Sequence, residues 1–146
     1  MNSKLQDSLP RDVILSNQKR YRLHKQVGKG GMGTVFEGKW IDPQSDNRKI
    51  ALKICDTSSP ERAEREADIL KKLSSINHNN IVKFHDSAFD GSHLVIIMEL
   101  IRGLALNDWL EQRYSDDNAG VIFRETQPII KQLAEGMACV YSTFLI

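Results

Sequence analysis

Hydrophobic and polar residues alternate with a period of two along much of the first hundred positions, a pattern typical of β-strands with one buried face. Short stretches rich in glycine, aspartate, asparagine and serine separate the alternating runs and predict turns. The predicted strands are residues 21–27, 34–41, 49–55, 81–89 and 93–99. Because tight turns join antiparallel neighbours, we expect these five strands to form one antiparallel sheet.

Helices are predicted where apolar residues recur at intervals of three and four. The first follows Ser58 and begins near Pro60, with an acidic residue, Glu61, close to its positive dipole end, and runs to about Leu73. Two more follow Gly103, a short one over 105–114 and a long one over 124–144. The long helix carries a wide apolar stripe that requires a partner. The stripe consists of Ile129, Ile130, Leu133, Met137, Val140, Tyr141 and Phe144.

The first 19 residues lack strong periodicity, and we interpret them as a polar leader with a short helical turn near residues 13–15. Residues 20–100 then form a compact lobe of five strands and one helix, and residues 101–146 are mainly helical. The predicted fold class is therefore α+β.

Composition excludes several classes of partner. Among 146 residues, 20 basic and 19 acidic side chains leave a net charge of +1, which provides no broad attraction for nucleic acid or anionic membranes. The longest apolar run, Leu94 to Met98, is far shorter than the roughly 18 residues that cross a bilayer. Cys55 and Cys139 lie far apart and outside any metal or redox spacing, so we expect reduced thiols, a cytoplasmic location and no metal-binding side chains.

Glycines at Gly28, Gly30 and Gly33 follow the GxGxxG spacing between the first two predicted strands. Residues without Cβ let backbone amides approach phosphate oxygens closely. A dinucleotide site would require a helix after these glycines, whereas residues 34–40 have the β-branched and aromatic pattern of a strand. A hairpin loop is therefore favoured, although a plain tight turn would use the same glycines.

Lys53 lies on the strand 49–55 together with Ala51 and Cys55, on the face opposite the aliphatic residues of that strand. A lone lysine on a strand is usually a solvated edge residue. Here the small side chain of Ala51 leaves room for a planar base, and the lysine ammonium beyond it could meet phosphate as a point charge.

Glu66 falls on the apolar face of the first helix, with Ala63, Leu70 and Leu73 at helical spacing around it. Burial of an unpaired carboxylate typically costs several kcal/mol of folding free energy. We therefore predict that Glu66 pairs with Lys53.

These features together resemble the eukaryotic-type protein kinases, from about Tyr21 to Ile146. The glycine loop 28–35, the strand 50–53 and Glu66 are similar to the family's glycine loop, VAIK strand and helix-C glutamate. The Gly-Gly-Met-Gly form of the loop looks most like bacterial serine/threonine kinases. Residues 78–82 resemble the HPNIV segment, with Asn79 where the family often has proline, and residues 133–137 resemble helix E.

The resemblance implies a kinase small lobe over 20–100, with a five-stranded antiparallel sheet and helix C, followed by a hinge and helices D and E of an incomplete large lobe over 101–146. It implies ATP with Mg²⁺ as cofactors and a protein substrate, with Lys53 orienting phosphates and Glu66 holding Lys53 as the catalytic residues. Met98 would be the gatekeeper, although core filling is the alternative. The implied ATP-binding residues are Val27, Gly28, Lys29, Gly30, Gly31, Met32, Gly33, Thr34, Val35, Ala51, Lys53, Met98, Glu99 and Ile101.

The sequence departs from the family by ending before the HRD and DFG motifs, which supply the catalytic base and the magnesium ligands. Two hypotheses follow. The chain is the ATP-binding part of a longer serine/threonine kinase, whose membrane anchoring further along stays open, or it is a short module that binds nucleotide or a protein without catalysis. Self-association through the stripe of the long helix is one expected interaction. A third hypothesis is an unrelated nucleotide-binding hairpin domain, which would require the positions of Lys53 and Glu66 to be a coincidence.

Overall fold

The computed structural model describes residues 9–43, 48–56, 58, 60–114 and 119–144. The chain divides into two compact units. The sheet unit comprises the residues up to Ile76 together with Val82–Leu100, and the helical unit comprises Asn77–Ile81 together with the residues from Ile101 onward. Each unit is described by itself.

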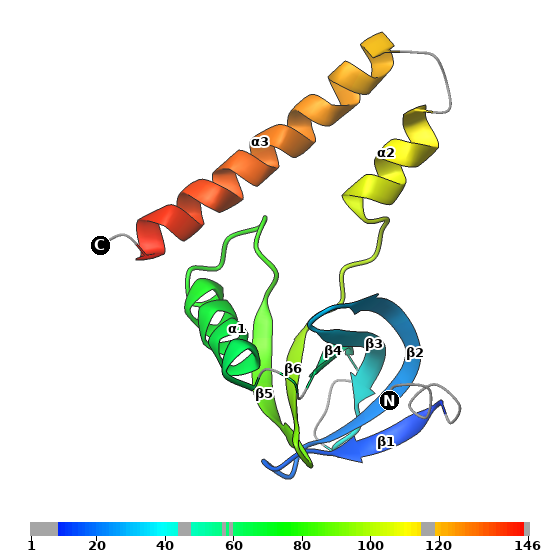
Figure 1. Cartoon of the computed structure of the whole chain (residues 1–146), viewed down its shortest axis with the longest axis vertical. Coiled ribbons are helices and arrows are strands. Elements are labelled where there is room, and N and C mark those ends of the chain that lie inside the picture. Colours follow the sequence, from blue (N-terminus) through cyan, green and yellow to red (C-terminus); the bar gives the residue numbers. More distant parts are fainter. Residues whose placement is uncertain (1–8, 44–47, 57, 59, 115–118, 145–146) are drawn as a thin grey trace. The chain divides into compact units, whose positions relative to one another are not determined.

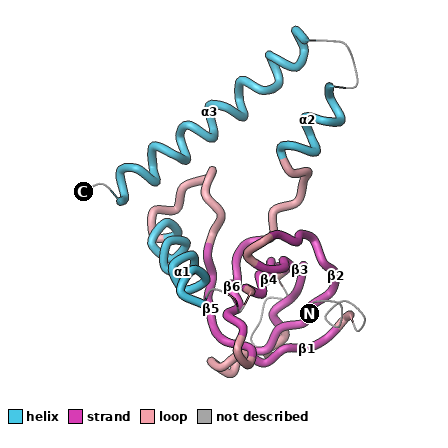
Figure 2. The backbone as a smooth tube through the Cα atoms, in the orientation of Figure 1, coloured by secondary structure: helices cyan, strands magenta, loops and turns pink. Residues whose placement is uncertain are grey.

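The described part of the sheet unit forms one antiparallel, six-stranded sheet in the order β1-β2-β3-β4-β6-β5, strongly curled and accompanied by the helix α1 (Figures 1 and 2). Its elements are β1 (Arg11–Ile14), β2 (Arg20–Gly30), β3 (Gly33–Trp40), β4 (Lys49–Cys55), α1 (Pro60–Ser74), β5 (Phe84–Asp90) and β6 (His93–Glu99). The α+β class is confirmed, and all five predicted strands are present.

The sixth strand, β1, lies within the residues that the sequence pattern indicated as a polar leader. The predicted helical turn near residues 13–15 is wrong, because Val13 pairs with Tyr21 in an antiparallel ladder with β2. Val13 and Leu15 are only 5% and 1% exposed. The strand has four residues, too few for a clear alternation, so pairing with β2 decides its conformation.

The segment after β1 joins the two edges of the sheet. The Ser16 amide donates a hydrogen bond to the carbonyl oxygen of Phe89 on β5 at 2.8 Å, and the Phe89 amide donates to the Ser16 hydroxyl oxygen at 3.1 Å. Asp86, also on β5, accepts hydrogen bonds from the Asn17 amide group at 2.9 Å and from the Lys19 ammonium at 2.6 Å. These contacts draw β1 and β5 together and leave little free edge.

Two apolar clusters fill the unit, one on each face of the central strand β4. The larger cluster is enclosed by the curled sheet and contains Leu52 and Ile54 of β4. The smaller cluster lies under α1, which packs against β5 and β6, and contains Cys55. The alternation predicted for residues 50–55 is confirmed, and β4 is buried on both faces.

In the helical unit, α2 (Leu106–Tyr114) and α3 (Ala119–Phe144) follow the segment 101–105. Asn80 contacts α3, since its amide group donates to the Gln132 carbonyl oxygen at 3.0 Å and to a carboxylate oxygen of Glu135 at 3.2 Å. Gly136 suits this approach, because a Cβ there would lie 3.3 Å from the Asn80 carbonyl oxygen.

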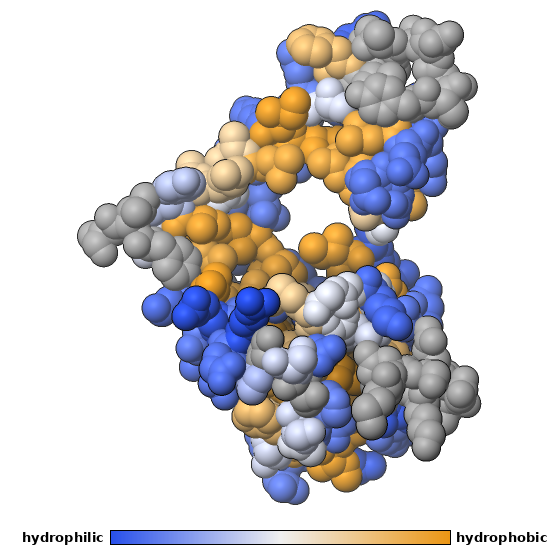
Figure 3. Space-filling model, viewed as in Figure 1, coloured by the Kyte–Doolittle hydropathy of each residue, from blue (hydrophilic) through white to orange (hydrophobic). Residues whose placement is uncertain are grey.

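The apolar stripe predicted on the long helix is partly exposed, as Figure 3 shows in part, whereas Ile129 and Val140 are half-buried. Its exposed members are Ile130, Leu133, Met137 and Tyr141. Phe144 ends α3, and its side chain lies outside the described part. None of the described helices has the length and apolar character needed to cross a membrane.

We predict that Leu15→Ala destabilises the protein by about 2–5 kcal/mol, because it removes a side chain that is 1% exposed from the larger cluster. Ile14→Ala is the matched control, since the neighbouring Ile14 is 59% exposed and should change the free energy of unfolding by less than about 0.5 kcal/mol. Urea denaturation of both variants measures the difference. Equal, small effects would show that the β1 segment does not contribute to the core in solution.

Alkaline pH should destabilise the fold through Tyr21. Burial, with smaller effects from the Asp86 and Asp42 charges, raises the pKa of the Tyr21 phenol from 10.0 to about 12. A raised folded-state pKa contributes stability that is complete below the unfolded pKa and is lost as pH rises through the folded pKa. Between pH 10.0 and about 12, the wild-type protein should therefore lose about 1–3 kcal/mol more than Tyr21→Phe. Denaturant titrations of both proteins across this range measure it, and parallel pH profiles would contradict it.

Candidate functional site

An ion pair joins β4 to α1. The Lys53 ammonium lies 2.6 Å from one carboxylate oxygen of Glu66 and 2.7 Å from the other. The side chains are 14% and 25% exposed, so both charges are largely removed from water. The predicted contact between these two residues is present, whereas their roles in binding nucleotide stay predictions.

Sheet register and helix packing place the pair. Lys53 lies opposite Val35 on β3 and Ile96 on β6, and residues directly opposite in antiparallel strands share a face. On α1, the buried residues Ala63 and Ala67 hold the helix against that same face, which brings Glu66 over the sheet. A charge left alone at this apolar junction would be costly, so each residue supplies the counter-charge of the other.

Cys55 is the next residue of β4 on the same face as Lys53. Burial raises the pKa of its thiol, the Lys53 charge partly opposes that shift, and the Glu66 charge adds to it. The thiol is therefore protonated and unreactive at neutral pH. Both cysteines are free.

The glycine-rich hairpin is tighter than the sequence predicted. Strand β2 continues through Gly28 to Gly30, the turn comprises Gly31 and Met32, and Gly33 begins β3. Gly28 lies opposite Val35 on β3, and Val35 lies opposite Lys53 on β4. The three residues are therefore neighbours across three adjacent strands.

The glycines of this hairpin serve different purposes. Gly33 has φ of +136°, and a Cβ there would collide with the carbonyl oxygen of Ile54, so the fold itself requires glycine at this position. A Cβ on Gly30 or Gly31 would meet nothing within 4 Å, and one on Gly28 would make an ordinary contact with Val35. Packing does not explain the glycines at positions 30 and 31, whereas close approach of an anion to the backbone would.

The implied ATP-binding residues divide between the two units. Ala51 lies opposite Met98 in the sheet, and Met98 packs against the smaller cluster, as core filling would require. Val27 is half-exposed on β2, and Ile101, in the helical unit, is 71% exposed. The structure therefore brings Val35, Ala51, Lys53 and Met98 onto one face of the sheet.

Two residues outside the predicted motifs are required by contacts between strands of the sheet. Lys83 fixes the end of β6, since its amide donates to a Glu99 carboxylate oxygen at 2.7 Å and its carbonyl accepts from the Glu99 amide at 2.9 Å. Gly38 on β3 is the second of these residues, since a Cβ there would collide with Leu52 and with the Arg22 carbonyl oxygen. No motif marks either residue, because their importance depends on contacts between strands.

The described residues fit the phosphates of a nucleotide better than they fit a metal ion. Lys53 offers one oriented ammonium, and open space lies where a Cβ would stand on Gly30, at the end of β2, and on Gly31, in the turn. Within the part of the chain that the structure describes, no three His, Cys, Asp or Glu side chains gather as metal ligands would.

Comparison with known proteins finds a family match and several relatives. Residues 21–146 match the family described as protein tyrosine and serine/threonine kinase. The chain is 30% identical to the serine/threonine-protein kinase pkn2 of Myxococcus xanthus over 94% of its own length and 16% of the relative's. It is 31% identical to the probable serine/threonine-protein kinase PknB of Lactococcus lactis, over 87% of its own length and 20% of the relative's.

A probable myosin light chain kinase of Dictyostelium discoideum is 29% identical over 86% of this chain and 37% of the relative's length. The chain therefore spans between 16% and 37% of the length of these three relatives. The match over residues 21–146 confirms the resemblance drawn from the glycine loop, Lys53 and Glu66, and the chain belongs to the protein tyrosine and serine/threonine kinase family.

Proposed function

We propose that this chain is the ATP-binding part of a serine/threonine protein kinase, which transfers the γ-phosphoryl group of ATP to protein hydroxyls. The observation that carries the proposal is the bidentate ion pair between Lys53 and Glu66, with distances of 2.6 and 2.7 Å. Such a pair presents a cation whose direction is set by the helix, which is what phosphate orientation requires. The names of the bacterial relatives support serine and threonine, rather than tyrosine, as acceptors.

Each site residue has a proposed role. Lys53 holds the phosphates, Glu66 holds Lys53, and the backbone of residues 28–35 covers the phosphates. Val27, Val35 and Ala51 enclose the adenine ring, and Met98 borders it. The Glu99 carbonyl and the Ile101 backbone form the hydrogen bonds to adenine. Ala51 is 5% exposed and small, which leaves space above the sheet for a planar ring.

Transfer of the phosphoryl group needs a catalytic base and magnesium ligands, which the site residues named above do not provide. The 146 residues contain no HRD or DFG sequence, whose aspartates act as the catalytic base and bind magnesium in the family. We therefore propose that this chain alone binds MgATP without transferring phosphate, and that the whole kinase supplies the base and the metal ligands. The free thiols of Cys55 and Cys139 agree with a cytoplasmic location.

A second candidate function is an interaction module without catalysis. It rests on the apolar stripe of α3, where Ile130, Leu133, Met137 and Tyr141 are between 52% and 61% exposed. Exposed apolar area of this kind favours association, including self-association. Nucleotide binding distinguishes the two candidates, because the first requires it and the second does not.

We predict that MgATP binds the purified chain saturably and that Lys53→Ala weakens binding at least about tenfold, a loss of about 1.4 kcal/mol. Lys49→Ala is the matched control, since Lys49 lies on the same strand and pairs with Glu37 at 3.0 Å, away from Glu66. Isothermal titration calorimetry measures affinity, and saturating nucleotide at about 100 times Kd should add about 2.7 kcal/mol of stability. A well-folded wild-type chain that does not bind MgATP would overturn the proposal.

Two glycine substitutions should separate folding from binding. Gly33→Ala should destabilise the protein by about 2–4 kcal/mol, because alanine is strained at positive φ and its Cβ collides with the Ile54 carbonyl oxygen. Gly30→Ala should change stability by less than about 1 kcal/mol, since open space surrounds that position. It should still weaken MgATP binding about tenfold. Thermal melts and calorimetry measure both, and undiminished binding by Gly30→Ala would remove the hairpin from the site.

A further inference from the structure

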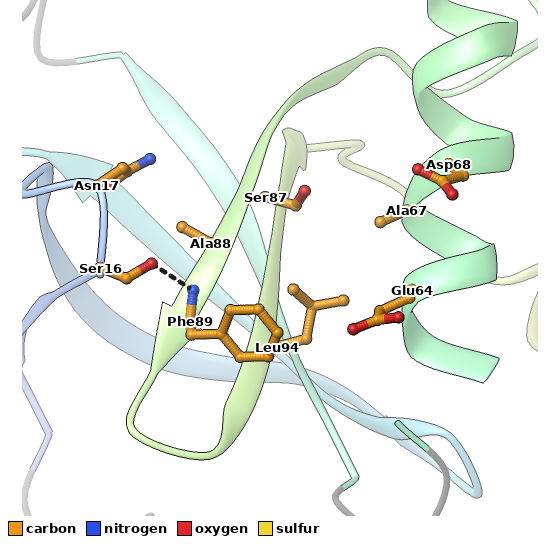
Figure 4. A pocket seen from close by; sticks show the side chains of 9 residues that line it. All are labelled: Ser16, Asn17, Glu64, Ala67, Asp68, Ser87, Ala88, Phe89 and Leu94. Atoms are coloured by element: carbon orange, nitrogen blue, oxygen red, sulfur yellow. Dashed lines mark hydrogen bonds between the residues drawn. The ribbon is translucent and has the colours of Figure 1, made fainter. Parts of the chain in front are cut away.

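A cavity of about 240 Å³ lies at one end of the curled sheet, where β2, β4 and β5 begin and β3 and β6 end. None of the residues proposed to bind nucleotide lines it. It also shares no lining residue with the pocket beside α1 that Figure 4 shows. The open end of a barrel-like sheet is a frequent place for ligand sites. We call this space the sheet-end cavity.

The base of the sheet-end cavity is apolar. Tyr21, Ile50 and Ile97 belong to the larger cluster and are 3%, 4% and 2% exposed. Burial raises the pKa of the Tyr21 phenol to about 12, so this side chain adds a neutral hydroxyl group at physiological pH. The cavity is smaller than the range of about 300–1,000 Å³ typical of pockets for drug-sized ligands, so it suits a single aromatic ring.

Trp40 provides an aromatic wall whose orientation is fixed. It lies opposite Tyr21 in the ladder of β2 and β3 and packs against the larger cluster. Its indole N–H donates to a carboxylate oxygen of Asp42, and the same oxygen accepts from the Arg20 amide at 3.2 Å. The indole N–H is therefore occupied within the chain, and the ring offers a ligand its apolar surface.

The charged residues of the lining are Lys19, Arg48 and Asp86, two cations against one carboxylate. The Asp86 carboxylate accepts a hydrogen bond from the Lys19 ammonium at 2.6 Å. It also accepts from the Asn17 amide group and from the Ser87 amide, both at 2.9 Å. These donors satisfy the carboxylate, so Arg48 gives the lining its excess positive charge.

Arg48 is exposed at the opening of the sheet-end cavity. A guanidinium carries five N–H donors and matches a carboxylate with two of them, so it can bind an anion while other donors keep a partner within the chain. The Lys19 ammonium lies 5.8 Å from the centroid of the Trp40 ring and adds positive charge beside the aromatic wall. The lining thus combines an apolar base, an aromatic wall and a cationic opening.

We propose that the sheet-end cavity binds a small aromatic carboxylate of about the size of benzoate. Its ring lies against Trp40 and the apolar base, and its carboxylate binds the Arg48 guanidinium. Charge complementarity and volume carry this assignment. An aromatic cation would meet the excess positive charge of the lining, and a neutral ring would gain nothing from Arg48.

Tryptophan fluorescence tests the proposal with the full chain carrying Trp109→Phe, which leaves Trp40 as the single indole among the 146 residues. Benzoate is the probe, and we expect a saturable change in emission with a Kd of about 0.1–10 mM, the range expected for so small a ligand. Arg48→Gln should weaken binding at least about fivefold, because it removes the charge-assisted contact. Ligand-observed NMR gives a second measurement on the chain that retains Trp109.

Lys49→Gln is the matched control, since it removes one positive charge from the next residue, which pairs with Glu37 at 3.0 Å and does not line the cavity. Its affinity for benzoate should equal that of the parent chain, and thermal melts verify that each variant folds. Lys53→Ala should also bind benzoate unchanged, so a failure of the nucleotide proposal would leave this result intact.

Ligand variants test the two parts of the assignment separately. Benzamide keeps the ring without the charge, and acetate keeps the charge without the ring, so each should bind at least about fivefold more weakly than benzoate. Absence of benzoate binding to the folded chain would overturn the proposal, as would equal losses in the Arg48 and Lys49 variants or equal affinity for benzamide. Binding of a peptide that ends in phenylalanine, without binding of benzoate, would overturn it in favour of a protein terminus as the ligand.

Discussion

Burial of β4 on both faces is the constraint on which the rest of the sheet unit depends. Leu52 and Ile54 fill the cluster inside the curled sheet, while Cys55 faces the cluster under α1. The lysine of this strand, Lys53, emerges at the boundary of the second cluster, where its charge needs a counter-ion. Glu66 provides that counter-ion, and the packing of Ala63 and Ala67 in the second cluster holds α1 where the two charges meet.

The glycine hairpin depends on the same strand. Gly33 must approach the backbone of β4 closely, because a side chain there would collide with the Ile54 carbonyl oxygen. This close approach holds the start of β3 against the strand that carries Lys53. The neighbouring glycines at positions 30 and 31 are free of such contacts. One end of the hairpin is therefore anchored for folding, while open space lies where a side chain would stand near its tip.

Closure of the sheet connects the residues before the kinase match to the rest of the unit. Ser16 bonds to Phe89, and Asp86 accepts from Asn17 and Lys19, so both edges of the sheet are joined by the segment after β1. Ser16, Asn17 and Phe89 also line a pocket beside α1. The segment around Leu15, which has no recognisable sequence pattern, thus completes the larger apolar cluster. Leu15 is accordingly only 1% exposed.

The sequence by itself determined the strands and helices with clear periodicity and the faces on which Lys53 and Glu66 lie, because spacing within one element follows directly from strand and helix geometry. Their pairing could be predicted since each charge would otherwise be buried alone. Only the tertiary structure decided that residues 11–14 form a strand, that Ser16 meets Phe89, and that Gly33 and Gly30 differ in what surrounds them. Those features depend on register and sheet curvature, which bring distant residues together without leaving any periodic trace in the chain.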